Sequence, residues 1–186
     1  MRIISGSLRG RRLAAVRGLA TRPTTDRTRE ALFNILGPAV VDREVLDLFS
    51  GTGALALEAL SRGARSALLV DSARAALATI RKNVAACGLA DVATIRHWDL
   101  RRRPTFLAAD EYQGYFDLVF MDPPYHRSLV DKTLIHLHDS GALADEALII
   151  AEHHMNDALA PVAPVYTLED QRRYGKTLVS FLKYML

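Results

Sequence analysis

The sequence contains a single cysteine, a single tryptophan and no long hydrophobic run. One cysteine, Cys87, excludes an internal disulfide framework and favours a reducing, cytoplasmic setting. No apolar stretch approaches the roughly 20 residues of a membrane span, and residues 1–6 lack the apolar core of a secretory signal. The histidines, His153 and His154 among them, lack the cysteine or carboxylate spacing of a zinc site. We therefore expect a cytoplasmic protein with neither a membrane segment nor a metal.

Positive charge is concentrated at the start of the chain. Residues 1–30 contain eight arginines, no lysine and only two acids, whereas the remainder has 16 basic and 19 acidic residues. Arginine suits bidentate contacts with phosphate and stacking on bases. The segment therefore predicts binding to a nucleic acid, although a solvated basic face is the alternative. Arg101, Arg102 and Arg103 either extend this surface or form a solvated loop.

Strand and helix patterns alternate after about residue 40. Strands that alternate with helices indicate a parallel α/β sheet covered on both faces. The length favours one α/β domain over 24–186 with a small basic β-ribbon and linker over 1–23. Strands are expected at 45–49, 66–70, 92–96, 116–121 and 146–151, with a closing antiparallel pair at 162–168 and 177–184, and helices at 26–37, 54–61, 73–86 and 128–138.

The tetrapeptide Asp122-Pro123-Pro124-Tyr125 follows the apolar run 116–121. A strand over that run delivers Asp122 to its carboxyl end, where α/β sheets bind ligands. Neither proline has a backbone N–H, so the corner offers acceptors and few donors. This suits a planar amine that donates two hydrogens, and Tyr125 adds a ring for base stacking. An ordinary strand-end turn is the alternative interpretation.

A glycine loop, Gly51-Thr52-Gly53, follows the first expected strand. Such a loop lets the backbone approach a ligand at a helix N-terminus. Asp71, which ends the second strand, is placed to accept both hydroxyls of a ribose. These features suit NAD as well as other adenosine cofactors, but Asp47 discriminates. A carboxylate there matches the ammonium of S-adenosylmethionine and poorly matches a pyrophosphate.

Trp98 and Asp99 follow the third expected strand. Asp99 is placed to accept from the amino group of an adenine, and Trp98 to flank the ring. The alternatives are a helix cap for Asp99 and core packing for Trp98.

These motifs, in this order, resemble class I S-adenosylmethionine-dependent amino-methyltransferases. The segments 2–13 and 22–36, the run 46–64 and Arg173-Tyr174-Gly175-Lys176-Thr177 resemble a narrower family, the bacterial small-subunit rRNA guanine-N2 methyltransferases of the D type. The resemblance implies a Rossmann-like, mostly parallel seven-stranded sheet with an antiparallel last strand. It departs from the family pattern at Asp71, where glutamate is expected, and at Lys176. The residues it implies are Asp122, Pro123, Pro124 and Tyr125 for catalysis, Asp47, Phe49, Ser50, Gly51, Gly53, Asp71, Ser72, Trp98, Asp99 and Asp122 for the cofactor, and Arg2, Arg9, Arg11, Arg12, Arg22, Thr24, Arg27 and Arg29 for nucleic acid.

The resemblance implies methyl transfer to N2 of a guanine in 16S rRNA, with the small subunit or its assembly intermediate as partner and a monomer as enzyme. Two alternatives stay open. The Asp-Pro-Pro-Tyr corner also suits adenine-N6 methylation of DNA, and a non-catalytic RNA-binding assembly factor could keep the same fold. An NAD-dependent oxidoreductase would need an acid or base at the hydride site, which we do not find.

Overall fold

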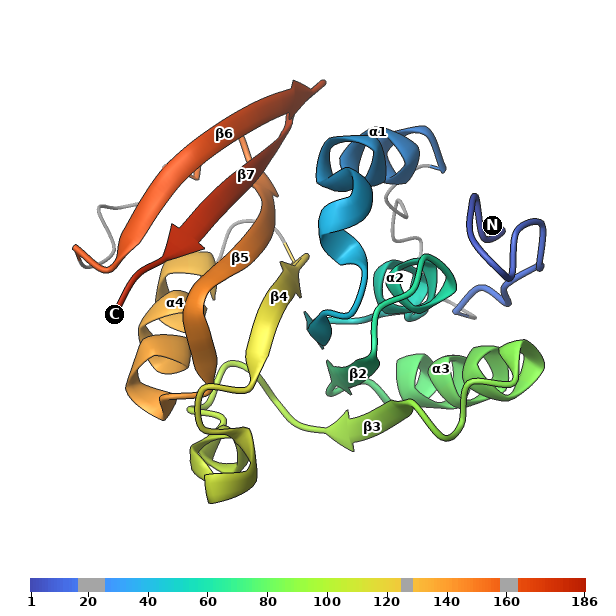
Figure 1. Cartoon of the computed structure of the whole chain (residues 1–186), viewed down its shortest axis with the longest axis horizontal. Coiled ribbons are helices and arrows are strands. Elements are labelled where there is room, and N and C mark those ends of the chain that lie inside the picture. Colours follow the sequence, from blue (N-terminus) through green and yellow to red (C-terminus); the bar gives the residue numbers. More distant parts are fainter. Residues whose placement is uncertain (17–25, 125–128, 158–163) are drawn as a thin grey trace. The chain divides into compact units, whose positions relative to one another are not determined.

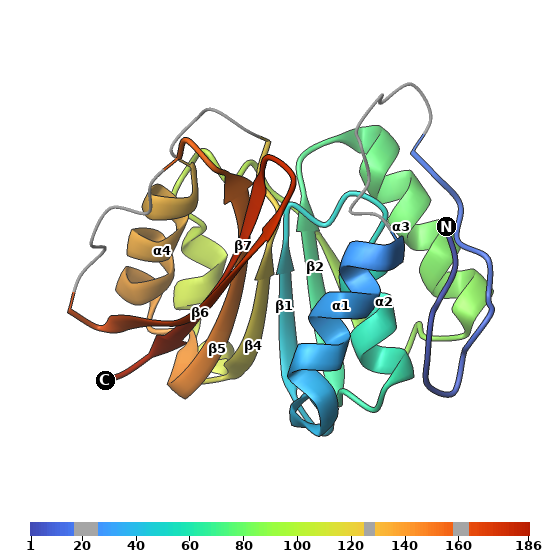
Figure 2. The same ribbon diagram turned by 90° about the horizontal axis from the view of Figure 1, so that it is seen from above.

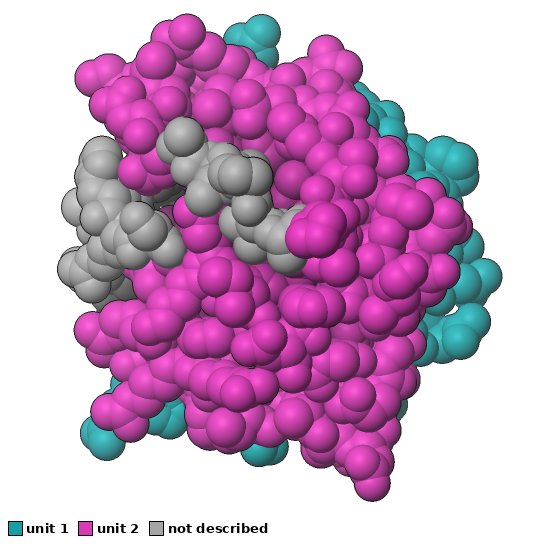
Figure 3. Space-filling view, turned by 90° about the vertical axis from the view of Figure 1, so that its left-hand side faces the viewer, with its two compact units in different colours: residues 1–97 teal, residues 98–186 magenta. Residues whose placement is uncertain are grey.

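The computed structural model describes residues 1–16, 26–124, 129–157 and 164–186. These residues form two compact units, 1–97 and 98–186, which Figure 3 colours teal and magenta. The predicted division after residue 23 falls outside the described residues and stays a prediction. Each unit has its own helices, strands and buried side chains, and each is described by itself.

The first unit alternates helices and strands, as predicted (Figure 1). Strand β2 pairs in parallel with both β1 and β3, with Leu46 opposite Leu68 and Leu68 opposite Thr94. The elements are α1 (Asp26–Leu36), the 3-10 helix η1 (Gly37–Val40), β1 (Glu44–Leu48), α2 (Ala54–Ser61), β2 (Ser66–Asp71), α3 (Arg74–Cys87) and β3 (Ala93–His97).

The core of the first unit consists of apolar strand residues and the inner faces of the helices. Val45, Leu46 and Leu48 of β1 are fully buried, as expected for a parallel strand covered on both faces. The parallel pairing of β1 with β2 brings the carboxyl ends of both strands together. Asp47, Asp71 and the glycine loop lie at or directly after those ends.

The N-terminal segment, residues 1–16, forms the predicted antiparallel ribbon. Arg2 bridges Arg12, and the Ile3 and Gly10 amides donate to the Arg11 and Ile3 carbonyls, each over 2.9 Å. Figures 1 and 2 show the segment beside α2 and α3. Ile3 and Leu13 are buried, so the basic segment is part of the first unit's core and is not a free arm.

The second unit contains β4 to β7. Strands β4 and β5 are parallel, whereas β7 pairs antiparallel with both β5 and β6. The closing antiparallel pair is confirmed, but its first strand lies later than the expected 162–168. The elements are η2 (Thr105–Ala108), η3 (Asp110–Tyr112), β4 (Phe116–Met121), α4 (Leu129–Ser140), β5 (Leu143–His154), β6 (Tyr166–Tyr174) and β7 (Thr177–Tyr184).

Helix α4 lies against β5 in both ribbon views. No helix in the described parts of the chain is long and apolar enough to cross a bilayer. Within those same parts, no three His, Cys, Asp or Glu side chains gather into a possible metal site. The buried His153 instead lies 2.9 Å from the Ser180 hydroxyl, which gives this histidine a structural partner.

Candidate functional site

The loop between β1 and α2 has an unusual backbone. Phe49 has a φ of 61°, which is rare for a residue with a side chain and costs strain that proteins tolerate mainly at functional sites. Gly51 and Gly53 also have positive φ, 57° and 76°. A Cβ on Gly53 would lie 2.8 Å from the Leu69 side chain. Glycine at 53 is therefore required by both conformation and packing.

Ser50, predicted to contact the cofactor, uses its hydroxyl inside the protein. The hydroxyl donates to the Asp47 carbonyl over 2.5 Å and accepts from the Val70 amide over 2.9 Å. It therefore joins the ends of β1 and β2 and fixes the start of the glycine loop.

Asp47, in β1, is only 2% exposed. Its carboxylate accepts a hydrogen bond from the Ala56 amide in the first turn of α2 over 3.3 Å. Burial raises the pKa of Asp47 to about 7, and the hydrogen bond only partly opposes this. No cation within the described chain pairs with Asp47. The group is thus a buried acid that suits a ligand bringing its own positive charge.

Asp71 holds the other side of the glycine loop. One carboxylate oxygen accepts from the Gly51 amide over 2.9 Å and the other from the Ala73 amide over 2.8 Å. Because a carboxylate oxygen has two acceptor positions, each retains capacity for a ribose hydroxyl. The Ser72 carbonyl lies 3.2 Å from Nε2 of His97. Ser72 itself is exposed, and its contact with the cofactor stays a prediction.

Asp99, in the second unit, is held by Arg101, which the sequence analysis did not assign to the site. Nε and Nη2 of Arg101 donate to its carboxylate over 2.9 and 2.7 Å, and the Arg101 amide does so over 3.1 Å. These bonds lower the pKa of Asp99 to about 2. The amide contact forms an Asx turn, so the helix-cap alternative is replaced by a local turn that keeps the acid ionised.

Trp98 packs as the second of its two interpretations predicted. Its ring meets the Phe106 ring edge-on, with centroids 5.3 Å apart, which is core packing. Its indole Nε1 is nevertheless buried and has no hydrogen-bond partner among the described residues. Buried donors normally have a partner, so this N–H is an exception, and the predicted contact of Trp98 with the cofactor stays a prediction.

Asp122 directly follows Met121, where β4 ends, as the apolar run predicts. Asp122 is half-buried, Pro123 is buried and Pro124 is exposed. Because both prolines lack an N–H, the corner presents a carboxylate and carbonyl acceptors at the strand end. Tyr125 lies outside the described residues.

The family model described as "Conserved hypothetical protein 95" matches residues 1–183. The chain belongs to this family. The match includes the basic N-terminal segment as well as Asp47, Asp71, Asp99 and Asp122. The segment is therefore a part of the family's common sequence.

Named relatives and solved structures match nearly the whole of this chain. The ribosomal RNA small subunit methyltransferase D of Escherichia coli K12 is 40% identical over 95% of this chain and 86% of its own length. The protein of that name from Haemophilus influenzae is 36% identical over 99% of this chain and 93% of its own. The solved structure of E. coli YhhF has a TM-score of 0.85 and 37% identity, covering 100% of this chain and 98% of that one.

A more distant structure supports the fold alone. An RNA methyltransferase from Salinibacter ruber in complex with S-adenosyl-L-homocysteine has a TM-score of 0.64 at 16% identity, covering 88% of this chain and 94% of that one. Together with YhhF it confirms the Rossmann-like class I methyltransferase fold expected for this family member.

Most described arginines of the predicted RNA-binding set face solvent. Arg22 and Thr24 lie outside the described residues. The exposed members are Arg2, Arg9, Arg11, Arg12 and Arg27.

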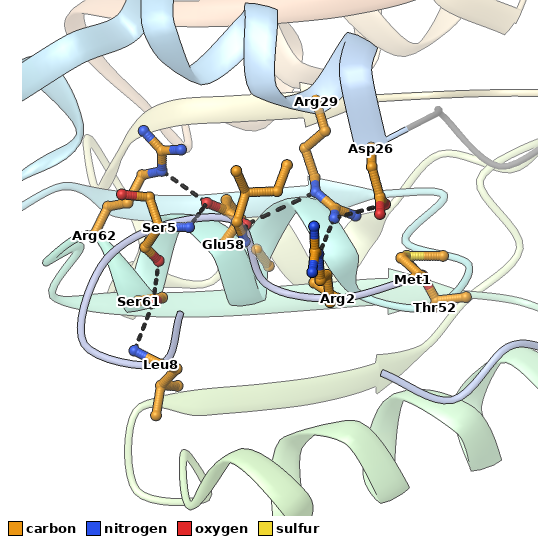
Figure 4. A network of polar contacts seen from close by, with 12 residues as sticks. Met1, Arg2, Ser5, Leu8, Asp26, Arg29, Thr52, Glu58, Ser61 and Arg62 are labelled. Carbon is orange, nitrogen blue, oxygen red and sulfur yellow. Dashed lines mark hydrogen bonds and ion pairs between the residues drawn. The ribbon is translucent and has the colours of Figure 1, made fainter. Parts of the chain in front are cut away.

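Arg29 is the exception, and its predicted contact with RNA is wrong. Its side chain is 1% exposed, and it donates to the Arg2 carbonyl and, over 3.1 Å, to Asp26 (Figure 4). Burial lowers the pKa of Arg29, while the charges of Asp26 and Glu58 oppose that shift. Arg29 lies on the buried face of α1 with Leu32 and Leu36, at helical spacing. The sequence analysis grouped Arg29 with the other arginines of the segment and did not use this spacing.

Glu58 is a structural residue, missed by the sequence analysis, that holds the N-terminal segment. It lies in α2, is fully buried, and accepts from the Ile4 and Ser5 amides over 2.8 and 3.0 Å (Figure 4). Arg62 also donates to it over 2.8 Å. A lone acid within the apolar helix sequence ALALEALS was the available signal, because a buried acid requires such partners.

Proposed function

We propose that this protein transfers a methyl group from S-adenosylmethionine to the exocyclic N2 of a guanine in 16S rRNA. The names of its relatives support methylation of small-subunit rRNA. The observation that carries the proposal is the buried Asp47, which has no cation beside it in the described parts of the chain and lies next to a strained glycine loop that Asp71 holds. Such a substrate implies a bacterial cytoplasmic protein, and we expect it to act as a monomer without a metal.

The residues of the cofactor loop suit S-adenosylmethionine. Asp47 would pair with its ammonium, the N-terminus of α2 would attract its carboxylate, and Asp71 would accept from its ribose. Asp99, kept ionised by Arg101, would accept from the adenine amino group, with Trp98 beside the ring. The cofactor supplies one thing to the reaction, a methyl group on a positively charged sulfur.

Asp122 and the Pro123 carbonyl would prepare the guanine amine. Its N2 lone pair is delocalised into the ring, so the amine is a weak nucleophile. Two acceptors that bind its two hydrogens turn the lone pair toward the methyl carbon and stabilise the positive charge that develops on nitrogen. S-adenosylmethionine would supply the methyl group and keep the electron pair of its C–S bond on sulfur, while Asp122 or water would accept the proton that N2 loses.

The base must leave its stack to reach this corner. Tyr125 would cover its face, a contact worth about 1–3 kcal/mol. The exposed arginines of the N-terminal segment, together with Arg22, Thr24 and Arg27, would bind the RNA backbone. Because these contacts position the substrate without reacting, the rate of the chemical step rests on alignment at Asp122.

The test uses labelled S-adenosylmethionine with small subunits purified from a strain lacking this modification, and in parallel with naked 16S rRNA. We expect N2-methylguanosine in the RNA, identified by mass analysis of its nucleosides, and the more active substrate identifies the physiological context. N6-methyladenine in a DNA control would instead support the DNA methyltransferase. Cofactor binding without methylation of any substrate would support the assembly factor.

A further inference from the structure

Asn83, in α3, connects the N-terminal segment to the glycine loop. Its side chain is 1% exposed. Its Oδ1 accepts from the Ala14 amide over 2.7 Å, and its Nδ2 donates to the carbonyls of Ala14 and Thr52 over 3.2 and 2.9 Å. Every donor and all but one acceptor position of the amide is therefore used. Neither Ala14 nor Thr52 is in regular secondary structure, so the side chain acts as a fixed point for two loops.

The contact with Thr52 matters because of where Thr52 lies. It stands between Gly51 and Gly53, which have positive φ. The Thr52 carbonyl and the Gly53 amide belong to one rigid peptide plane, and that amide donates to the Ser50 carbonyl over 2.7 Å. Asp71 holds the amide of Gly51, two residues earlier in the loop. Asn83 and Asp71 thus fix neighbouring parts of a loop whose glycines would otherwise sample many shapes.

We propose that Asn83 is a positioning residue for S-adenosylmethionine binding. It holds the peptide between Thr52 and Gly53 in the conformation that receives the cofactor, and the N-terminal segment fixes the orientation of its amide. The proposal rests on the proposed function in one respect, that the glycine loop is the cofactor loop. Its consequence is that Ala14, the residue of the N-terminal segment that Asn83 holds, contributes to cofactor affinity even in the absence of RNA.

Ser61 offers a matched control. Its hydroxyl donates to the Ser5 carbonyl over 2.6 Å and accepts from the Leu8 amide over 3.0 Å. Like Asn83, Ser61 is a buried helix residue whose side chain forms hydrogen bonds with backbone atoms of the N-terminal segment. Its side chain has no contact with the glycine loop, however. Ser61→Ala therefore loosens the segment at Ser5 and Leu8 and leaves both Ala14 and Thr52 held by Asn83.

The experiment measures the Kd of S-adenosylmethionine by calorimetry on the full chain without RNA, and then kcat and KM with RNA. Asn83→Ala should raise Kd and the cofactor KM about tenfold, because the loop loses a buried hydrogen bond, while kcat stays within about twofold of wild type. Asn83→Asp keeps the acceptor for Ala14 but cannot donate to Thr52, so its Kd should rise at least as much. Ser61→Ala should leave Kd within about twofold of wild type.

Two results would overturn the proposal. One is an unchanged Kd in Asn83→Ala and Asn83→Asp, each shown to be folded by circular dichroism. The other is an equal rise in Ser61→Ala, which would assign the effect to the segment as a whole. The wild-type measurements keep the two hypotheses apart. If wild type binds the cofactor and methylates no guanine, the proposed function fails while the Kd comparison still decides the role of Asn83.

Discussion

Two acids predicted for the same cofactor lie in opposite environments. Asp47, in the first unit, is buried beside the start of α2, and burial raises its pKa to about 7. Asp99, in the second unit, lies in a loop where Arg101 binds both of its oxygens and lowers its pKa to about 2. Arg101 supplies the cation for Asp99, whereas no cation of the described residues pairs with Asp47.

This difference matches the partners that the two acids are proposed to have. A ligand ammonium can replace the missing cation at Asp47, so the charge there is completed only on binding. An adenine amino group is neutral and cannot neutralise Asp99, so that acid needs a permanent cation of its own. The comparison predicts that mutation of the two acids changes stability in opposite directions.

The largest effect is expected from Asp47→Asn. Because the folded-state pKa lies above the ordinary value of 3.8, the folded protein retains a proton that the unfolded chain releases between about pH 4 and 7. Wild-type stability should therefore fall as pH rises through this window, by up to about 4 kcal/mol. Asp47→Asn lacks this loss and should be more stable than wild type at pH 8, while its Kd for S-adenosylmethionine rises about 100-fold.

Urea denaturation at pH 5, 6, 7 and 8 without cofactor measures this effect. Asp99→Asn is the control with the opposite sign. Its contribution is present above about pH 4 and is lost only as pH falls toward 2, so the variant should be slightly less stable than wild type, within about 1 kcal/mol. If the stability of Asp47→Asn and that of wild type changed with pH in the same way, the raised pKa of Asp47 would be contradicted.

The third acid, Asp122, should separate catalysis from binding. Asp122→Ala removes an acceptor for the guanine amine in the transition state, so kcat should fall at least about 100-fold. Calorimetry should show that S-adenosylmethionine still binds. Near-normal single-turnover rates in Asp122→Ala would show that Asp122 is not a catalytic residue.

A smaller effect is expected from Arg101→Ala, which frees Asp99. The pKa of Asp99 should return toward its ordinary value, because the Arg101 hydrogen bonds are the main cause of its shift. Cofactor Kd should rise about threefold at pH 7 and further as pH approaches 4, where wild-type affinity is still unchanged. Calorimetry measures this Kd between pH 7 and 4. An equal pH dependence of Kd in Arg101→Ala and wild type would show that Arg101 does not affect cofactor binding.

The smallest effect per residue concerns the exposed arginines of the N-terminal segment. Changing Arg9, Arg11 and Arg12 to alanine should weaken RNA binding and reduce the salt slope of log K by about 0.7 for each phosphate that an arginine no longer neutralises. Arg65, an exposed arginine outside the segment, is the control, and Arg65→Ala should leave the slope unchanged. Equal slopes in the triple variant and wild type would make the segment a solvated face.

Local sequence patterns were sufficient for most of the fold. The helix expected over 54–61 is α2, and the apolar run 116–121 is β4 with Asp122 directly after it. Periodicity fails where pairing decides. Strand β6 was expected over 162–168 but spans Tyr166–Tyr174. Most of its side chains are exposed, so its position is set by pairing with β7, which the local sequence does not encode.

In the site, likewise, the sequence indicated the residue types, whereas the partners of those residues came from the structure. The sequence identified Asp99 but not Arg101, because three neighbouring arginines look alike until one of them folds back. It assigned Arg29 to RNA because the charge of a segment does not reveal which helix face is buried. Ser50, Glu58 and Asn83 were missed in their actual roles, since each acts through backbone atoms distant in sequence.

By itself, then, the sequence determined the order of the elements and the acids at the strand ends, because hydrophobic period and turn chemistry are local properties. Only the tertiary structure decided which charges are buried and which are paired. It alone also decided that Asn83 connects the N-terminal segment to the glycine loop. The physical reason is that burial and hydrogen bonding depend on atoms brought together from remote parts of the chain.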